Sequence, residues 1–419
     1  MKYKIMRQKI SEFSSSLEPR LKKMFETCFY SSLDTAAKPM EDGTTFMLTG
    51  DIPAMWLRDS AVQVMGYLPY AKLDDDVNVL IRGLIKRQLN YIILDPYANA
   101  FNAEPNNQGH KDDITDSDNP WIWERKFEID SLCYPLWLIE KYYEETKDES
   151  IFDDLFYKAL EVIIQTFETE QYHFEKSKYF HYRPKYPQFP TLNNEGKGNP
   201  VGYTGLIWNG YRPSDDVCEY GYLVPSNMFA SVILRWLISL KLPKDLKSRS
   251  EKLLSDIEQG IEKFGTVEHP KYGKIYAYEV DGLGGVNIMD DANVPSLLSL
   301  PYLGYCEKND TLYQNTRKFI LSKDNPYYYE GKFGKGVGSP HTPKDYIWHI
   351  AVIMQLLTSD SKQEKLACFD ILMNTDAGLG VMHESFNKDN PHEFTREWFC
   401  WANTLFAIAI VDLKQGKLI

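Results

Sequence analysis

The sequence predicts an all-α fold, an (α/α)6 barrel with long loops over the active-site end. Helical periodicity dominates the 419 residues, and few segments alternate apolar and polar residues as half-buried strands do. The helical segments are of two kinds, amphipathic and almost wholly apolar, and the two kinds alternate six times. Amphipathic helices cover a core, whereas helices that are apolar on every side lie within it, so six helices are expected inside six others.

The outer ring is expected from six segments that carry one charged face and one apolar face. In the second segment, Val77, Leu80 and Leu84 form an apolar stripe opposite Arg82 and Lys86. Such a stripe packs against a core while the charged side chains remain in water. The six segments are 18–31, 74–93, 150–169, 244–264, 310–322 and 361–373.

The inner ring is expected from six apolar segments, each of which follows a polar stretch of sequence. In two concentric rings every inner helix starts at the same end, so the polar stretches converge there and build one pocket. A closed ring has no internal boundary, and we therefore expect residues 1–419 to form a single domain. The six segments are 61–71, 131–143, 223–240, 294–304, 346–357 and 399–412.

Two long segments without helical period, 95–125 and 171–214, are expected to be loops over this pocket. Loops of this length in a compact domain are usually functional. Part of the second, at Phe180–Tyr182, has a weak strand pattern that would suit a small hairpin at the barrel mouth.

Charge and composition narrow the range of possible binding partners and cellular locations. The net charge of −12 repels phosphate backbones and anionic lipid, so we expect neither nucleic acid nor a membrane surface as a partner. Six scattered cysteines without a C-x-x-C pair indicate free thiols in a reducing compartment. The first residues lead into no apolar stretch of signal-peptide length, which makes the cytoplasm of a bacterium the expected location. We expect a monomer or weak oligomer.

Two carboxylate motifs stand directly before inner helices. Asp215 and Asp216 precede one such segment, and Glu384 lies in a glycine-containing loop before the last. Each has an ordinary interpretation, since acids at helix starts are commonly caps and loop carboxylates are commonly solvated. If the fold brings them together, they are suited to be the acid and base of a sugar-cleaving enzyme.

The stretch at 49–60 combines Trp56, Arg58 and Asp59 at another helix start. Capping and an Arg–Asp ion pair would explain it, and so would a sugar clamp, because carboxylates and arginine bind hydroxyls and an indole covers an apolar sugar face. The aromatic content of 14% fits either a ring-packed core or a groove for sugars. The eight histidines form no ligand pattern, so we expect neither a metal nor another cofactor.

Several long motifs resemble glycoside hydrolase family 125, whose members are bacterial and fungal exo-α-1,6-mannosidases. The motifs cover about 49–406 and are TGDIPAMWLRDS, DPYANAFNAEPN, WIWERKFEIDSLCYP, YRPSDD, MDDANVPSLLS, GSPHTP, MHESF and FTREWF. The resemblance implies an (α/α)6 barrel and an inverting, metal-independent hydrolase that removes terminal mannose from α-1,6 linkages, including N-glycan fragments.

The resemblance also implies roles for particular residues. Asp215 corresponds to the general acid, with Asp216 as the less favoured neighbour, and Glu384 to the general base. The implied contacts to mannose hydroxyls come from Trp56, Arg58, Asp59, Glu128, Asp216, Asn293 and His341. Inversion leaves room for a water molecule, so the two catalytic carboxyl groups are expected about 6.5–9.5 Å apart.

Two alternatives remain open at the level of the sequence. Another sugar-active barrel enzyme, such as a different glycosidase or a uronate lyase, would share the helix pattern; a lyase would favour basic residues, which the acidic balance opposes. A non-catalytic glycan-binding barrel would keep the aromatic lining and have no need of the acid pair.

Overall fold

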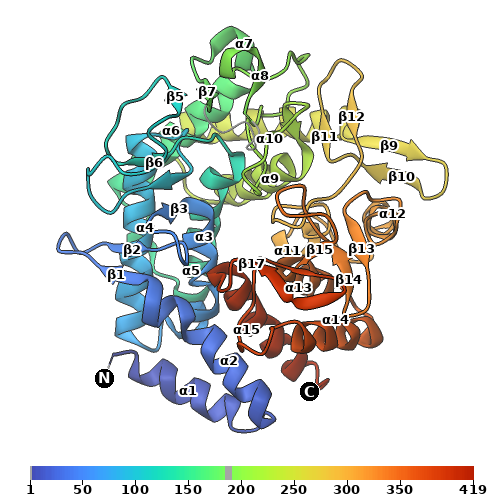
Figure 1. Cartoon of the computed structure of the whole chain (residues 1–419). Coiled ribbons are helices and arrows are strands. Elements are labelled where there is room, and N and C mark those ends of the chain that lie inside the picture. The colour runs from blue at the N-terminus through green and yellow to red at the C-terminus, as the bar shows by residue number, and fades with distance from the viewer. Residues whose placement is uncertain (1, 185–190) are drawn as a thin grey trace.

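All six predicted outer helices are present in the computed structural model, which describes residues 2–184 and 191–419 (Figure 1). Five of them begin where a Glu, Asp or Ser side chain accepts hydrogen bonds from the first free backbone N–H groups, which explains their starting points. These helices are α2 (Pro19–Ser31), α4 (Asp75–Leu94), α6 (Asp154–Glu170), α10 (Lys244–Phe264), α12 (Thr311–Ile320) and α14 (Lys362–Asn374).

Four of the apolar segments form the expected long inner helices, and two do not. The prediction for 61–71 is only partly right, because the helix stops at Val62 and a 3-10 turn, η2 (Met65–Tyr70), follows. The prediction for 294–304 is wrong except for one turn. The inner helices are α3 (Leu57–Val62), α5 (Ile129–Thr146), α9 (Val224–Ser239), α11 (Leu300–Leu303), α13 (His349–Leu357) and α15 (Cys400–Gln415).

The failure at 294–304 has a local cause. Pro295 and Pro301 lack the N–H groups that a continuous helix uses. The buried carboxylate of Asp290 accepts hydrogen bonds from the backbone N–H groups of Leu297 and Leu298, at 2.8 and 2.9 Å, and so fixes a loop in place of the first helical turns. Apolar composition indicated burial here correctly but not conformation.

The inner helices pack side by side, and the end of the chain packs against its beginning. Helix α5 contacts α3 and α9, and α9 also contacts α11; α15 contacts α13, α3 and α2. In Figure 1 the C-terminal helix α15 accordingly lies beside α2 and α3. One continuous apolar core extends from Met6 in the N-terminal helix α1 (Lys4–Ser14) to Leu413 in α15.

Short strands hold the polar stretches at the start of three inner helices. Strands β3 (Met55–Trp56), β8 (Tyr222–Leu223) and β15 (Tyr346–Trp348) run directly into α3, α9 and α13, and each belongs to a three-stranded sheet. The pairing fixes the direction in which each polar stretch enters its helix.

The weak strand pattern at 180–182 is confirmed. Strand β7 (His181–Tyr182) pairs with β5 (Ile114–Thr115) and so joins the two predicted long loops. Residues 185–190 of the second loop lie outside the described residues. The remaining short elements are η1 (Ser32–Ala36), η3 (Glu149–Ile151), α7 (His173–Lys176), α8 (Asn193–Gly196), β1 (Ala37–Pro39), β2 (Thr45–Met47), β4 (Ala100–Phe101), β6 (Ile122–Glu124), β9 (Thr266–His269), β10 (Gly273–Tyr276), β11 (Glu279–Val280), β12 (Val286–Asn287), β13 (Tyr328–Glu330), β14 (Lys335–Val337), β16 (Ser385–Asn387) and β17 (Asn390–Thr395).

The described part of the chain contains no helix long and apolar enough to cross a membrane. All six cysteines are unpaired, and all but Cys306 are buried.

Candidate active site

A small cavity lies where the polar stretches before the inner helices meet. Asp215 and Glu384, the two carboxylates predicted to act together, both line it. The lining side chains come from 49–59, 213–215, Asn293, 341–348, Glu384 and 396–401. Segments separated by hundreds of residues in the sequence therefore form one small chamber.

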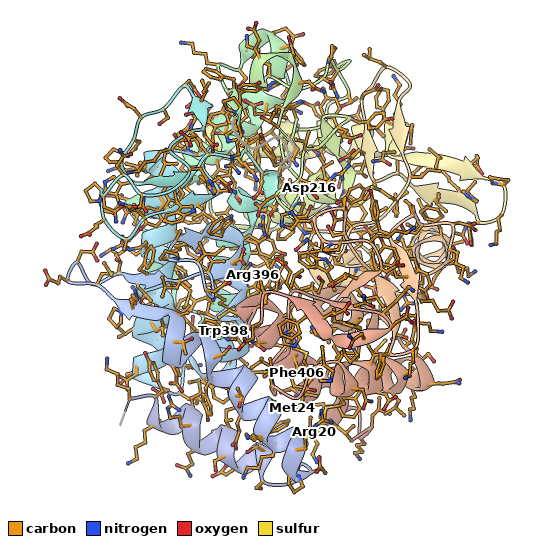
Figure 2. All side chains as sticks on the ribbon, viewed as in Figure 1. Arg20, Met24, Asp216, Arg396, Trp398 and Phe406 are labelled. Atoms are coloured by element: carbon orange, nitrogen blue, oxygen red, sulfur yellow. The ribbon has the colours of Figure 1, made fainter. Side chains whose placement is uncertain are left out.

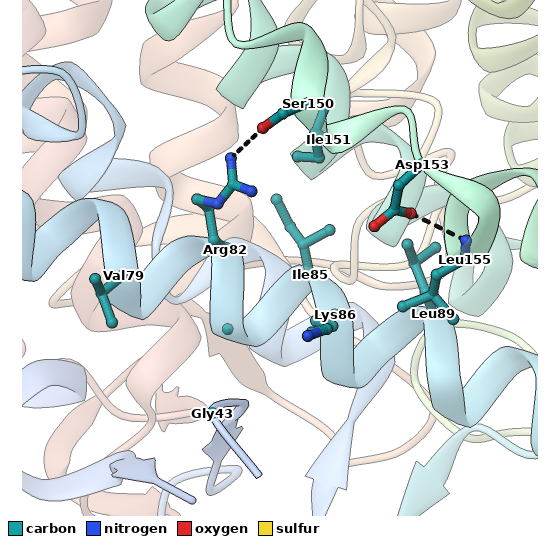
Figure 3. Close-up of a pocket in the computed structure, with 11 residues that line it drawn as sticks. Gly43, Val79, Arg82, Ile85, Lys86, Leu89, Ser150, Ile151, Asp153 and Leu155 are labelled. Atoms are coloured by element: carbon teal, nitrogen blue, oxygen red, sulfur yellow. Dashed lines mark hydrogen bonds between the residues drawn. The ribbon is translucent and has the colours of Figure 1, made fainter.

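A larger hollow of about 750 Å³ lies elsewhere, on the outside between α4 and the start of α6 (Figure 3). Its only lining carboxylate among the described residues, Asp153, accepts hydrogen bonds from the N–H groups at the start of α6, beginning with that of Leu155. Its Arg82 bonds to Ser150 and pairs with Asp148. These groups are engaged in local structure, so the chemistry of a catalytic pair is found in the smaller cavity.

Five of the predicted sugar contacts line the same cavity as the two carboxylates: Trp56, Arg58, Asp59, Asn293 and His341. The other two lie around it. Glu128 is buried and bonds to the Arg58 guanidinium, while Asp216 opens onto a neighbouring polar hollow that shares His341 with the cavity. Figure 2 places Asp216 and Arg396 near the middle of the molecule.

Asp215 sits in a strained turn. Its φ of 69° is in the left-handed region, which costs a non-glycine residue about 1–2 kcal/mol. The turn closes with two backbone hydrogen bonds, from the N–H of Asp215 to the carbonyl of Arg212 (2.8 Å) and from the N–H of Arg212 to the carbonyl of Asp216 (2.7 Å). Strain of this kind persists only where the surroundings hold the residue in place, and it is common at functional sites.

Two buried side chains hold this turn from the protein side. The Arg212 guanidinium donates to Glu279 at 2.6 Å, and the Ser214 hydroxyl donates to Asp291 at 2.9 Å. Burial, together with the charge of Asp216, raises the pKa of Asp291. The Asp215 side chain remains 26% exposed, so the residue between these anchors is the one that reaches the cavity.

Arg58 lies among four carboxyl groups. Its Nη1 lies 2.7 Å from Glu128 and 3.0 Å from Asp130, its Nε 3.6 Å from Asp59, and its Nη2 3.9 Å from Asp215. Burial raises the pKa of Glu128 and of Asp130, against the opposing effect of the Arg58 charge. The cluster fixes the guanidinium rigidly in the cavity wall.

Glu384 is held by a different cation. Its backbone N–H donates to the carbonyl of Thr395 at 3.2 Å, beside the β16–β17 hairpin, and its side chain is 9% exposed. Arg396 Nη1 lies 3.7 Å from the Glu384 carboxylate, and Arg396 Nε donates to Asp51 at 3.0 Å. Arg396 therefore links the last polar stretch of the chain to the first.

His341 is a charged group at the boundary of the cavity. Its Nδ1 lies 3.4 Å from Asp216. Burial disfavours the imidazolium, but the hydrogen bond and charge of Asp216 outweigh this effect and raise the pKa of His341 to about 9. A positive charge thus lies opposite the Asp215 turn at neutral pH.

Two uncharged buried donors of the cavity lining have no hydrogen-bond partner within the described residues, besides the charged Nε–H of Arg58. They are the indole N–H of Trp56 and the side-chain amide NH₂ of Asn293. Buried polar groups in folded proteins are nearly always paired, so unpaired donors in a cavity wall indicate a ligand that brings acceptors. Sugar hydroxyls are acceptors of this kind.

Sequence reasoning missed three residues of the site: Arg396, Asn99 and Lys126. The last two contact Asp215; Asn99 lies in the long segment 95–125 and Lys126 directly follows it. Sequence spacing gives no indication that these side chains reach across to the Asp215 turn. Over the described ranges, no group of three or more His, Cys, Asp or Glu side chains is arranged to hold a metal ion.

Comparison with known proteins identifies the family. A family model described as metal-independent alpha-mannosidase (GH125) matches residues 18–411. The chain belongs to glycoside hydrolase family 125. It is accordingly a metal-independent α-mannosidase, and the cavity that holds Asp215 and Glu384 is its candidate active site.

Individual relatives agree with this assignment. The Meiotically up-regulated gene 157 protein of Schizosaccharomyces pombe is 40% identical, over 99% of this chain and 86% of that protein. A family 125 α-mannosidase from Streptococcus pneumoniae, solved as a non-productive complex with α-1,6-mannobiose, is 46% identical with a TM-score of 0.95 over 98% of both chains. A bacterial glucoamylase complexed with acarbose shares the fold alone, at 12% identity and a TM-score of 0.55, over 96% of this chain and 57% of that one.

Proposed function

We propose that this family 125 enzyme is an inverting exo-α-1,6-mannosidase that releases terminal mannose from α-1,6-linked mannosides, including N-glycan fragments. The observation that carries the proposal is the presence of Asp215 and Glu384 on the wall of one small cavity, together with unpaired donors from Trp56 and Asn293. The choice of linkage is supported by the α-1,6-mannobiose bound to the Streptococcus pneumoniae relative.

Asp215 is proposed as the general acid and Glu384 as the general base. Asp215 donates a proton to the leaving oxygen, and Glu384 removes one from the attacking water. The surrounding charges support this division of roles. Arg396 lies 3.7 Å from Glu384, whereas the arginine nearest Asp215, Arg58, has closer contacts to Glu128, Asp130 and Asp59.

The residues around the pair are proposed to bind one mannose. Trp56, Arg58, Asp59, Asn293 and His341 contact the sugar directly. Glu128 acts through Arg58, which it orients at 2.7 Å, and Asp216 acts through His341 at 3.4 Å. A water molecule between the sugar and Glu384 requires a carboxyl separation of about 6.5–9.5 Å, and this distance remains part of the proposal.

The architecture behind the site is proposed to be a complete (α/α)6 barrel formed by a single domain, 1–419. The packing of α3, α5, α9 and α11 in series, and of α13 on α15 and α15 on α3, supports the inner ring. The continuous apolar core that extends from Met6 to Leu413 supports the single domain. A bacterial, cytoplasmic enzyme that acts as a monomer or weak oligomer, without nucleic acid or membrane as partner, stays a prediction.

Hydrolysis of α-1,6-mannobiose followed by proton NMR tests the proposal. We expect mannose to appear first as the β-anomer, because inversion converts the α-configuration at the anomeric carbon into the β-configuration. Asp215→Asn and Glu384→Gln are each expected to abolish turnover with an unchanged circular dichroism spectrum. Asp216→Asn is the matched control and retains measurable turnover.

The outcomes are distinct. Early release of the α-anomer would exclude inversion. An inactive Asp216→Asn beside an active Asp215→Asn would move the acid to the neighbouring residue. No mannose released between about pH 5 and 8 would exclude the hydrolase itself.

A further inference from the structure

Lys126 is a buried lysine whose ammonium reaches the turn of the proposed general acid. Its Nζ donates a hydrogen bond to the backbone carbonyl of Asp215 at 2.9 Å and lies 3.4 Å from the carboxylate of Glu124. The residue is 6% exposed. Lysine is almost never buried without a partner, so the location of this ammonium is set by these two contacts.

Asn99 contacts the carboxyl group itself. Its amide NH₂ donates to Glu124 at 3.0 Å and lies 3.4 Å from Oδ1 of Asp215. Its amide oxygen accepts the backbone N–H of Lys126 at 3.1 Å. Because that oxygen must face an N–H donor, the NH₂ group must face the two carboxylates, which fixes the orientation of the amide.

Glu124, which both residues share, is anchored from the second long loop. The Arg183 guanidinium donates to Glu124 at 2.8 Å and to both oxygens of Asp113, at 2.6 and 2.7 Å. All of these groups are buried or nearly so. The platform under Lys126 and Asn99 is therefore rigid and joins the two loops predicted over the pocket.

The conformation of Asp215 depends on these contacts, because its backbone is in the left-handed region. Arg212 and Ser214 hold the turn from one side, and Lys126 is the side chain that binds the Asp215 carbonyl from the other. A residue at φ 69° relaxes when its surroundings release it. Relaxation would rotate the peptide and turn the carboxyl group away from the leaving oxygen.

We propose that Lys126 and Asn99 are positioning residues that aim the Asp215 carboxyl group at the leaving-group oxygen. This inference rests on the proposed role of Asp215 as general acid. Neither side chain lines the cavity, so each acts through Asp215 and not on the sugar.

Substrates with different leaving groups distinguish a residue that aims the acid from one that only supports the fold, because only the first changes the rate selectively. Cleavage of α-1,6-mannobiose expels a sugar alkoxide and needs the proton of the acid. Cleavage of 2,4-dinitrophenyl α-mannoside expels a weakly basic phenolate and does not need it. General acid catalysis contributes about 10²–10⁴ in rate, and a misdirected acid loses part of this factor for the first substrate only.

The experiment compares kcat/KM for both substrates in wild type, Lys126→Met and Asn99→Ala. We expect a fall of about 10- to 100-fold on mannobiose and less than about threefold on the dinitrophenyl substrate. Lys365→Met is the matched control, since Lys365 is also largely buried and paired, with Asp412 at 2.6 Å, but makes no hydrogen bond or ion pair with the Asp215 turn. It should leave both substrates unaffected.

Equal losses on both substrates in the two variants would overturn the inference, and so would unchanged activity on mannobiose. If Lys126→Met does not fold, Asn99→Ala tests the inference by the same comparison, the loss of kcat/KM on mannobiose against the loss on the dinitrophenyl substrate. Asp215→Asn separates this inference from the proposed function: it must show the same selectivity in a stronger form. An Asp215→Asn that loses both activities equally contradicts the assigned acid, whatever Lys126 does.

Discussion

Replacement of Arg58 by methionine should destabilise the protein by an amount that depends strongly on pH. Arg58 is 3% exposed and has buried carboxylates on three sides, at 2.7, 3.0 and 3.6 Å. Methionine keeps much of the side-chain volume and removes the charge. Glu128, Asp130 and Asp59 are then left in the interior without their cation.

The size of the effect follows from two limits. Removing one partner of a buried, hydrogen-bonded ion pair costs about 3–5 kcal/mol. A buried carboxylate that has lost its cation can avoid this penalty by becoming protonated, which costs about 1.4 kcal/mol for each pH unit above its ordinary pKa of about 4. Protonation of the carboxylate therefore costs about 4 kcal/mol at pH 7 and about 1.5 kcal/mol at pH 5.

The sign is the same for each carboxyl group of the cluster. Burial already raises the pKa of Glu128, Asp130 and Asp59, and loss of the Arg58 charge raises it further. A group whose pKa is raised on folding favours the folded state below its unfolded pKa and disfavours it progressively as the pH rises. The free energy lost by Arg58→Met should therefore be about 3–5 kcal/mol near pH 7 and about 1–2 kcal/mol near pH 5.

Urea unfolding at both pH values, followed by circular dichroism, measures this difference. Arg235→Met is the matched control: Arg235 pairs with Glu258 at 2.8 Å but both are more than 40% exposed, so the loss should stay below about 1 kcal/mol. A triple variant with Glu128→Gln and Asp130→Asn should recover most of the stability. A loss from Arg58→Met that is equal at the two pH values would refute the reasoning.

Three further predictions concern single residues. His341→Gln should lower the unfolding free energy at pH 7 by about 1 kcal/mol, a value reduced for solvent screening because the side chain is 30% exposed. In the wild type this contribution is fully present below about pH 6.5 and is lost as the pH rises through about 9. Equal urea midpoints of wild type and variant at pH 7 would contradict the prediction. Gly109→Ala, at φ 122°, brings a Cβ within 2.2 Å of the Trp123 carbonyl oxygen and should lower the unfolding free energy by more than about 1 kcal/mol, well beyond Gly43→Ala, where nothing lies within 4 Å. Arg396→Lys should reduce kcat/KM on α-1,6-mannobiose about tenfold or more, because an ammonium cannot keep both partners of the guanidinium fork; unchanged kinetics would contradict it.

The outer helices were predictable because their signals are local. The segment 244–264 has an apolar stripe at helical spacing, and α10 spans Lys244–Phe264 as predicted. The inner segments were harder, because a buried segment is apolar whatever its conformation. At 294–304 two prolines and the side chain of Asp290 produce a loop where composition predicts a helix.

The same distinction applies to the site. Asp215 and Glu384 were predictable because each lies in a polar stretch that leads into an inner helix, and a ring of such helices brings these stretches together, although the β16–β17 hairpin separates Glu384 from α15. Lys126 and Arg396 could not be assigned, because their roles depend on the groups that they contact in the fold, the backbone carbonyl of Asp215 and the carboxylate of Glu384. Glu128, which is predicted to hold sugar hydroxyls, accepts a hydrogen bond from Arg58 and does not line the cavity, and sequence spacing does not distinguish it from the residues that do.

The charges of the site explain why one cavity can hold two carboxyl groups with opposite proposed tasks. Arg396 comes from the segment directly after β17, so its guanidinium reaches the Glu384 carboxylate at the base of the same hairpin, at 3.7 Å. Arg58 enters from the opposite wall and reaches Asp215 only at 3.9 Å, behind closer contacts to Glu128 and Asp130. The Asp215 turn is also held through its backbone by Lys126, which donates to the Asp215 carbonyl at 2.9 Å and so fixes the direction of the side chain. The proposed base thus has Arg396 beside it, whereas the arginine near the proposed acid is shared with three closer carboxyl groups and the turn that carries the acid is held through its backbone.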